Sequence, residues 1–436
     1  MGTSTNCFAR YRAFQASLRS ECRIHLRGEE MRLQALDGWR GLVAVLVILF
    51  HVYVLHTFFL AEWLRYLAPV LEFFFIVSGF VMALGFGDKV TDTKSFVGYI
   101  IRRGGRVWPI HLAMIGLLLL IPLLRFIMQT PGDLFSGQLT LESLPAQLLI
   151  LQTWTPEYAM TWNYPSWTLS GEVFAYFLMG ILVWVARKEP LRWVLGLMII
   201  AVAGTFFYNA MMSSPNYNTV TVSRAVTGFF FGFLLYHAWR RYPLTNVRVA
   251  AVLEVVVVIA CCLLFQWHPD GLAYFLFYPL FAALIYAYAG DNGLVSRFMC
   301  SSPLQWLGKY SFSIYMFHGV VSKWIMIAGR FIDARTELPL IRAVEAPSVV
   351  HTVNVIDLPQ QWMNDLLVLA YVIVVLVGGR IIYSLVEAPS RDYFKDLSIR
   401  MMKRMAAKEA AKQSEISGGV APVAAAAAPE APTQRP

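Results

Sequence analysis

The sequence predicts an all-α protein, a polytopic bundle of transmembrane helices with about ten spans. Apolar residues make up 58% of the chain and charged residues only 14%, whereas soluble domains contain about 45–50% and about 25%. The apolar residues form runs long enough to cross a bilayer as helices, which takes about 20 residues. The bases that give the net charge of +9 gather where these runs end. Because that distribution is typical of cytoplasmic loops and no recognition motif is present, we expect a lipid bilayer and no nucleic acid as partner.

Ten spans are expected along the chain, and bases concentrate in the even-numbered gaps between them, which places both termini in the cytoplasm. Two external segments, about 125–165 and about 329–363, are longer than ordinary connectors, and long ordered loops tend to carry function. The aromatic residues of the first segment are equally typical of a belt at the lipid headgroups. The expected spans lie near 41–60, 67–86, 107–124, 166–186, 193–210, 224–240, 249–266, 272–289, 310–328 and 364–386.

Basic segments flank the predicted transmembrane domain, which covers 36–395. Residues 1–35 form an arginine-rich cytoplasmic extension without the apolar core of a signal peptide, and one hypothesis is that translation starts at Met31. Residues 396–436 are expected to form a short basic helix and then a disordered Ala/Pro-rich cytoplasmic tail. Paired metal ligands such as CxxC or HxxxH are absent from the sequence, so we expect no metal and no permanently bound cofactor.

The first span carries the leading functional candidates. It reads LDGWRGLVAVLVILFH from Leu36, with Arg40 followed eleven residues later by His51. Eleven helical residues rise about 16.5 Å and complete about three turns, so both side chains share one face, and Asp37 falls on the same broad stripe. An imidazole near mid-membrane has lost its water and is a functional candidate by default. The alternative is a histidine that hydrogen-bonds a neighbouring helix only to fix packing.

Two arginines, Arg103 and Arg106, lie in the stretch YIIRRGGRVWPIHL, which is expected to be a loop before the third span. Arginines at a cytoplasmic membrane edge can bind phosphates through fork-shaped, charge-assisted hydrogen bonds. The two glycines between them would let backbone amides approach an anion closely. The alternative is ordinary anchoring of the protein by positive charge on the cytoplasmic side.

Three later spans place polar groups at membrane depth. Glu172, about six residues into the fourth span, must be paired or protonated there, and either state could serve proton transfer. The alternative is that Glu172 pairs with another group only to stabilise the structure. Ser78, in the second-span stretch VSGF, is more typical of close helix contact. His318 lies nine residues after Lys309 and is expected at the depth of His51. Together these groups indicate a polar interior.

Six stretches, taken together, resemble the acyltransferase-3 family of integral membrane O-acyltransferases. They are LDGWRG…FH, FFFIVSGF, RRGGRVWP, PSWTLSGEVFAYF, YSFSIYMFH and VEAPSRDYF, and they follow the family's order over about 36–395. The departures are small. Thr168 stands where the family usually has serine, and His111 takes a position that is commonly aromatic.

The resemblance implies transfer of an acyl group, usually acetyl, from cytoplasmic acyl-CoA to a hydroxyl of a cell-surface glycan or related acceptor. It implies a multi-pass protein of a bacterial inner membrane. Arg40, Arg103 and Arg106 would bind the donor, and His51 would be the general base or a transient acyl carrier. Glu172 would orient the acceptor or pass its proton, and His318 would complete the catalytic set. Supporting roles are expected for Asp37, Ser78 and Ser170.

A transporter or flippase for a lipid-linked glycan or a proton-coupled solute is the competing class. Histidine and glutamate inside a membrane are typical of proton relays. Many transporters, however, have paired halves with helices broken at equivalent places, and the sequence shows no such symmetry. The sequence therefore favours the acyltransferase.

Overall fold

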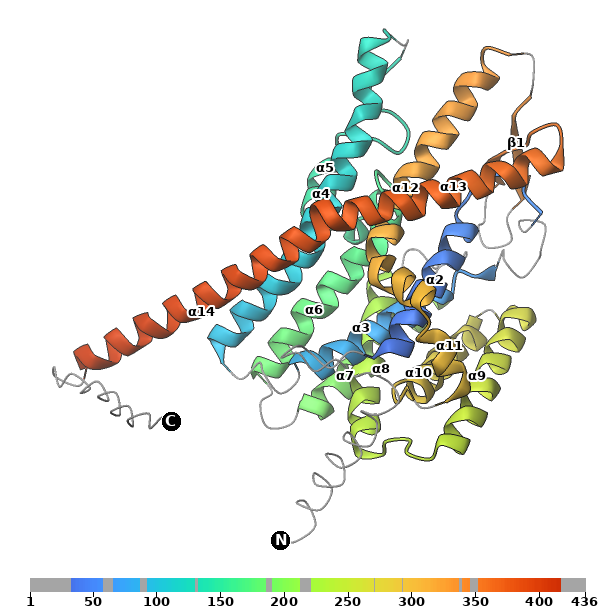
Figure 1. The fold of residues 1–436 in the computed structure, drawn as a ribbon. Coiled ribbons are helices and arrows are strands. Elements are labelled where there is room, and N and C mark those ends of the chain that lie inside the picture. Colours follow the sequence, from blue (N-terminus) through green and yellow to red (C-terminus); the bar gives the residue numbers. More distant parts are fainter. Residues whose placement is uncertain are drawn as a thin grey trace, which may run out of the picture.

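The protein is described here from a computed structural model, in which long helices form a bundle (Figure 1). The described residues are 33–57, 66–86, 92–129, 132–185, 190–211, 221–269, 271–291, 293–336, 339–345 and 352–416. The N-terminal extension up to residue 32, with the hypothetical start at Met31, and the tail from residue 417 lie outside them.

Helices account for most of the described chain, and one antiparallel hairpin, β1 (Ile341–Glu345) with β2 (Thr352–Ile356), is the exception. The main helices are α2 (Gln34–Phe50), α3 (Val70–Phe86), α4 (Thr93–Ile127), α6 (Trp167–Val185), α7 (Pro190–Met211), α8 (Thr221–Arg241), α9 (Val247–Trp267), α10 (Phe277–Tyr288), α12 (Ser302–Asp333), α13 (Gln361–Ile382) and α14 (Ala388–Ile416). Short elements are α5 (Leu144–Leu148), η2 (Gln152–Trp154), η3 (Pro156–Tyr158), η4 (Tyr164–Ser166), η5 (Gly271–Leu276), α11 (Leu294–Met299) and η6 (Tyr383–Glu387), a π-helical turn that joins α13 to α14.

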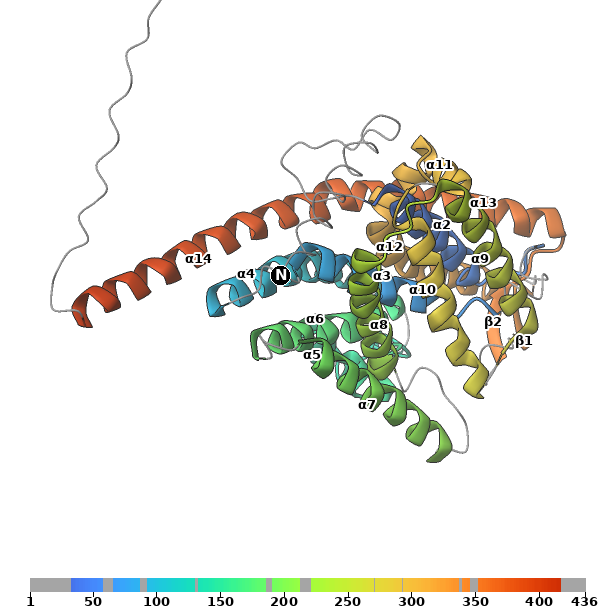
Figure 2. The same ribbon diagram turned by 90° about the horizontal axis from the view of Figure 1, so that it is seen from below.

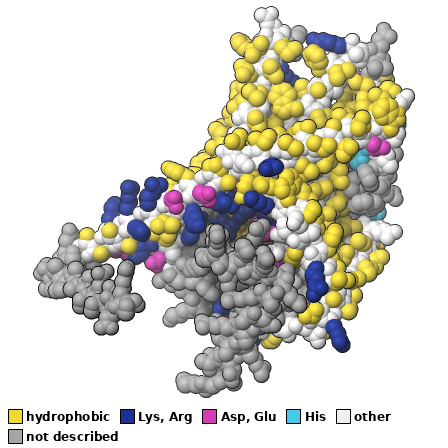
Figure 3. All heavy atoms as spheres, viewed as in Figure 1, with side chains coloured by type: hydrophobic (Ala, Val, Ile, Leu, Met, Phe, Trp, Pro, Cys, Tyr) yellow, Lys and Arg dark blue, Asp and Glu magenta, His cyan; other side chains and the backbone are white. Residues whose placement is uncertain are grey.

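Apolar side chains cover much of the outside of the bundle (Figure 3). Leu123 on α4, Val252 on α9 and Ile373 on α13 are each at least half exposed, which suits contact with lipid tails rather than water. Each predicted span coincides at least in part with a helix. By length and apolar composition, three of the described helices could cross a membrane, Thr93–Ile127, Val247–Trp267 and Gln361–Gln413. The all-α class is thus observed, and the number of spans stays a prediction.

The first span is shorter than the predicted 41–60. α2 ends at Phe50, and the chain then runs extended to Thr57. The extended part pairs with β2: Leu55 N donates to Ile356 O (2.8 Å), and Ile356 N donates to Tyr53 O (2.9 Å). Inside a bilayer a non-helical backbone must satisfy its hydrogen bonds with other protein groups, and the hairpin from the second external segment provides them.

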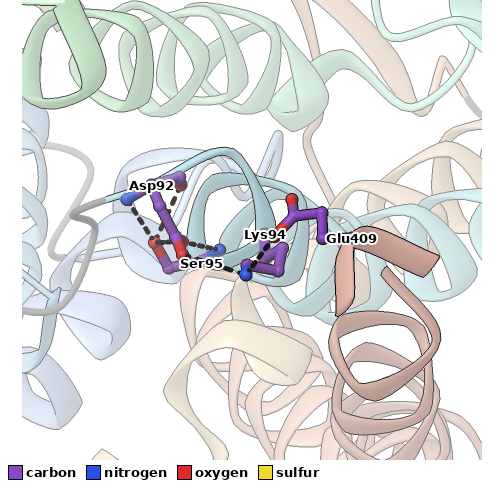
Figure 4. Close-up of polar contacts among 4 residues, drawn as sticks. All are labelled: Asp92, Lys94, Ser95 and Glu409. Atoms are coloured by element: carbon purple, nitrogen blue, oxygen red, sulfur yellow. Dashed lines mark hydrogen bonds and ion pairs between the residues drawn. The ribbon is translucent and has the colours of Figure 1, made fainter. Parts of the chain in front are cut away.

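α4 begins fourteen residues before the predicted third span, so Arg103 and Arg106 lie inside a helix and not in a loop. Asp92 caps this helix by accepting from Ser95 N (2.8 Å), and Lys94 forms an ion pair with Glu409 of α14 (Figure 4). α4 and α14 run side by side in both ribbon views (Figures 1 and 2). This contact accounts for one glycine of the motif: a Cβ on Gly105 would lie 2.1 Å from the Phe394 ring.

α2 and α12 pack parallel to each other at very close range. A Cβ on Gly41 would lie 2.5 Å from Gly308 N, and a Cβ on Gly308 would lie 2.2 Å from Asp37 O. Both helices therefore begin at one end of the bundle, which we call the basic end because Arg40, Arg103 and Arg106 lie toward it. The two long segments that the sequence predicts to be external lie toward the other end, which we call the acceptor end after the role that the family resemblance implies for it.

Candidate active site

The two predicted histidines meet in the middle of the bundle. His51 lies ten residues after Gly41, and His318 lies ten residues after Gly308. Since those glycines are in contact and the helices are parallel, equal spacing brings the imidazoles to the same depth, where their ring centroids are 5.3 Å apart. His318 is fully buried, in the middle of the 32-residue α12. His51 is half-buried and caps the C-terminus of α2.

Backbone carbonyls fix the tautomer of each neutral imidazole. His51 Nδ1 is 2.9 Å from Val47 O, and His318 Nδ1 is bonded to Tyr315 O. A carbonyl oxygen only accepts hydrogen bonds, so Nδ1 carries the proton in both rings and Nε2 keeps its lone pair. Two basic nitrogens are therefore presented side by side, which is what a site that removes protons from hydroxyl groups needs.

The first external segment places an aromatic ring beside the two histidines. The ring of Tyr164, in η4, is 5.3 Å from that of His51 and 5.7 Å from that of His318. On the neighbouring side, Ser322 Oγ donates to His51 O (3.4 Å) and is bonded to Tyr371 of α13 (3.0 Å). The sequence did not identify Ser322 or Tyr371, and it left Tyr164 between a functional loop and a lipid-headgroup belt. The sequence pointed to Tyr164 only through its place in a long loop, next to Pro165.

The arginines lie toward the basic end, Arg40 on α2 and the other two on α4. Arg40 Nη1 forms an ion pair with Asp37 (3.1 Å). Arg106 lies over the ring of Phe312, 6.0 Å from its centroid. Phe312 is one turn beyond Gly308, which contacts α2 at Asp37. Arg40 therefore lies about three turns from the histidines, and Phe312, the ring beneath Arg106, lies less than two turns from His318.

Glu172 connects to the arginines and not to the external segment. Its Oε1 accepts hydrogen bonds from Ser78 of α3 and from the Tyr176 hydroxyl. The guanidinium of Arg103 lies over the Tyr176 ring, 5.0 Å from its centroid, so the carboxylate is joined through Tyr176 to a predicted donor-binding arginine. Ser78 thus has a hydrogen-bonding role, whereas Gly79 beside it makes the close helix contact, against the backbone of Phe229.

Ser170 lies nearer the acceptor end and accepts a hydrogen bond from Thr153 Oγ1 (2.6 Å) of η2. Thr168, which replaces the family's usual serine, is bonded to the Tyr315 hydroxyl (2.9 Å). Thr168 therefore joins α6 to Tyr315, whose ring is 5.4 Å from that of His318, and Ser170 joins α6 to η2. Among the described residues no cluster of three or more His, Cys, Asp or Glu could hold a metal ion.

A family model described as an acyltransferase domain matches residues 33–384, most of the chain and all the residues of the site. The chain belongs to the acyltransferase-3 family. It is therefore an acyltransferase, of the class that transfers groups other than aminoacyl groups. Among curated proteins it is similar to "Acyltransferase MdmB" of Streptomyces mycarofaciens, with 31% identity over 121 residues. That match spans 27% of this chain and 29% of the relative. No solved structure matches the chain.

Proposed function

We propose that this acyltransferase takes its acyl group from acyl-CoA at the basic end and transfers it to a hydroxyl group of a glycan or related acceptor at the acceptor end. The observation that carries the proposal is the shared axis of α2 and α12. Arg40 lies at the basic end of this pair, where α4 brings Arg106 against Phe312 of α12, and two unprotonated imidazole nitrogens lie about 16 Å from the level of Arg40. Phosphates of CoA suit the arginines, and the extended pantetheine arm would bring the thioester toward the imidazoles. An acetyl group is the donor group that the family resemblance implies.

The chemistry is an ester-forming acyl transfer. His51 Nε2 removes the proton of the acceptor hydroxyl while its oxygen attacks the thioester carbonyl, and collapse of the tetrahedral intermediate breaks the C–S bond. The CoA thiolate then takes the proton from the imidazolium, so ester and free thiol are the products. A positioned base contributes typically about 10²–10⁴-fold to such a step. In the second route His51 Nε2 attacks the thioester carbonyl and the C–S bond breaks, so that His51 carries the acyl group and the CoA thiolate leaves. His318 Nε2 then removes the proton of the acceptor hydroxyl, whose oxygen attacks the acyl carbonyl and breaks its bond to His51, and the thiolate takes that proton from His318.

Glu172 supports the donor side in this proposal. Because it binds the Tyr176 hydroxyl, and the Tyr176 ring lies beneath Arg103, the carboxylate fixes a surface on which that arginine rests. This placement differs from the expected role in orienting the acceptor. It predicts that loss of the carboxylate acts chiefly on donor binding.

The experiment compares wild type with His51→Ala and Arg106→Gln in proteoliposomes, with acetyl-CoA labelled in the acetyl group and a purified surface glycan. His51→Ala should lose at least about 100-fold in transfer at saturating donor, because both routes need its Nε2. Arg106→Gln should keep most of its maximal rate and raise the half-saturating concentration of acetyl-CoA. Arg330→Met, at the exposed outer part of α12, is the matched control. Wild-type transfer by His51→Ala would refute both routes.

A further inference from the structure

Three buried polar atoms near the acceptor end have no hydrogen-bond partner within the described part of the chain. They are Nε2 of His318, Oδ1 of Asn163 and Nζ of Lys323. Asn163 and His318 are fully buried. A buried polar group without a partner loses about 1–3 kcal/mol relative to water, so each such group indicates an absent water or ligand.

Asn163 is held in one orientation. Its Nδ2 donates to Met316 O of α12 (3.0 Å), so the opposite atom, Oδ1, is turned toward the next residues of α12. A Cβ on Gly319 would lie 2.5 Å from that oxygen and 2.5 Å from Pro165 Cδ. Only a glycine therefore leaves room for the amide oxygen at this place.

Lys323 lies one helical turn beyond Gly319, on the same face of α12. Helical side chains lean toward the N-terminus of their helix, a lean that directs a lysine at this position back toward the turn of Gly319. Its Nζ is buried, and no ion pair of the described residues includes it. A buried ammonium group without a described carboxylate partner therefore lies one turn from the residue that faces the Asn163 oxygen.

We propose that Asn163 and Lys323 form an acceptor subsite that binds a polyhydroxylated group, such as a sugar ring, next to the hydroxyl that is acylated. This inference rests on the proposed function. A hydroxyl group donates one hydrogen bond and accepts others, so a single hydroxyl can donate to Asn163 Oδ1 and accept from Lys323. A second hydroxyl of the same ring then reaches the free Nε2 of His318 or His51.

The chemistry of the three atoms favours hydroxyl groups over a carboxylate or phosphate. An anion would pair with Lys323 but has no hydrogen to give to the two acceptors, Asn163 Oδ1 and His318 Nε2. A simple alcohol carries a single donor, which leaves one of those acceptors unmet. A site built to bind hydroxyl groups discriminates strongly against partners that lack them, because its own polar atoms are then left unpaired.

The test measures transfer from labelled acetyl-CoA to unacylated surface glycan, purified from a strain of the source organism that lacks the gene. Asn163→Ala and Lys323→Met should each raise the half-saturating glycan concentration by about ten- to a hundredfold. The half-saturating acetyl-CoA concentration should stay within about twofold of the wild-type value, since the basic end is untouched. Arg330→Met removes a positive charge from the same helix at an exposed position and should match wild type in both constants.

The double variant tests whether the two residues share one acceptor group. Removal of both should cost no more than about the larger single effect, because partners of one ligand are not independent. Additive losses, or an unchanged glycan constant in folded single variants, would overturn the subsite. A folded fraction equal to that of wild type, measured by size-exclusion chromatography in detergent, separates binding from misfolding. If wild type itself transfers nothing to any glycan, the proposed function fails first, so the two failures remain distinct.

Discussion

At the residue scale, Asp291 ties α2, the helix that carries His51, to a distant part of the chain. Its carboxylate accepts hydrogen bonds from Gln34 N (3.2 Å) and Ala35 N (2.8 Å). The first amides of a helix have no partner within it, and Leu33, at the N-cap position of α2, provides no side-chain cap. Asp291 therefore caps α2 from the loop that follows α10, and fixes the height at which Arg40 and His51 lie.

The pKa of Asp291 makes this cap sensitive to pH. Burial raises the pKa of its carboxyl group from 3.8 to about 6, against the two amide hydrogen bonds that lower it. Because the folded pKa is above the unfolded one, the protonated form is the more stabilising. This contribution to the free energy of unfolding is complete below about pH 4 and is lost as the pH rises through about 6. A pKa difference of one between the folded and unfolded states corresponds to about 1.4 kcal/mol.

Asp291→Asn should remove this dependence. Asparagine keeps an oxygen for Ala35 N and tolerates the positive φ of 51° at this position. The thermal midpoint of the variant in detergent should exceed that of wild type at pH 7.5, and the difference should shrink toward pH 4.5. A wild-type advantage at pH 7.5 would mean that the charge itself holds the helix, through attraction to the helix dipole.

Several single residues could be predicted from sequence and others could not. The shared depth of His51 and His318, and the shared helix stripe of Arg40 and Asp37, followed from helical spacing. Asp291 could not be found, because its partners lie 256 residues earlier in the chain. The link from Glu172 to Arg103 also depends on a third residue, Tyr176, whose role only packing reveals.

At the element scale, the parallel contact of α2 with α12 sets the separation of the two imidazoles. Gly308 meets a backbone oxygen of α2, at Asp37, so the obstacle to a larger residue cannot rotate away. Overpacking of this kind costs about 1–3 kcal/mol. It would also push the helices apart, so the catalytic pair should suffer along with stability.

Gly308→Ala should therefore lose acyl transfer at saturating donor and acceptor by at least about tenfold, even where the folded protein is recovered. Gly116→Ala is the matched control, since nothing lies within 4 Å of a Cβ there and alanine is the better helix former by up to about 1 kcal/mol. Equal rates for Gly308→Ala and wild type would show that the 5.3 Å separation of the rings is not needed for transfer.

Element boundaries show where hydropathy fails as a guide. The apolar run continues past Phe50 to Leu60, so the sequence predicted a helix to residue 60. The helix ends earlier because Ile356, about 300 residues later, offers backbone partners to an extended chain. The stretch with Arg103 and Arg106 was expected to be a loop before the third span, but the long partner α14 supports a helix there, with Phe394 packed over Gly105.

At the scale of the whole molecule, the proposed donor-binding arginines and the two long loop segments lie toward opposite ends of one bundle. Lys and Arg side chains gather along α14 and beside it in Figure 3, whereas apolar side chains cover most of the rest of that face. If the basic end faces the cytoplasm, as the charge bias predicts, acyl-CoA can enter from that side alone.

Sealed vesicles of opposite orientation test this. Inside-out vesicles should release CoA from externally added acetyl-CoA, and right-side-out vesicles should do so only after a detergent makes them permeable, because polyanionic CoA does not cross a bilayer. The orientation of each preparation is checked by protease access to the C-terminal tail. Equal donor use by both sealed preparations would contradict a single donor entrance at the basic end.

The equal intervals from Gly41 to His51 and from Gly308 to His318 restrict how this chain can change in length. One residue inserted into either interval would turn its imidazole by about 100° and shift it by about 1.5 Å relative to the other. A single substitution along these stretches leaves the register of the two helices unchanged, but one insertion or deletion moves the two rings apart. Length variation among natural variants should therefore gather in the connecting loops and avoid these two ten-residue intervals.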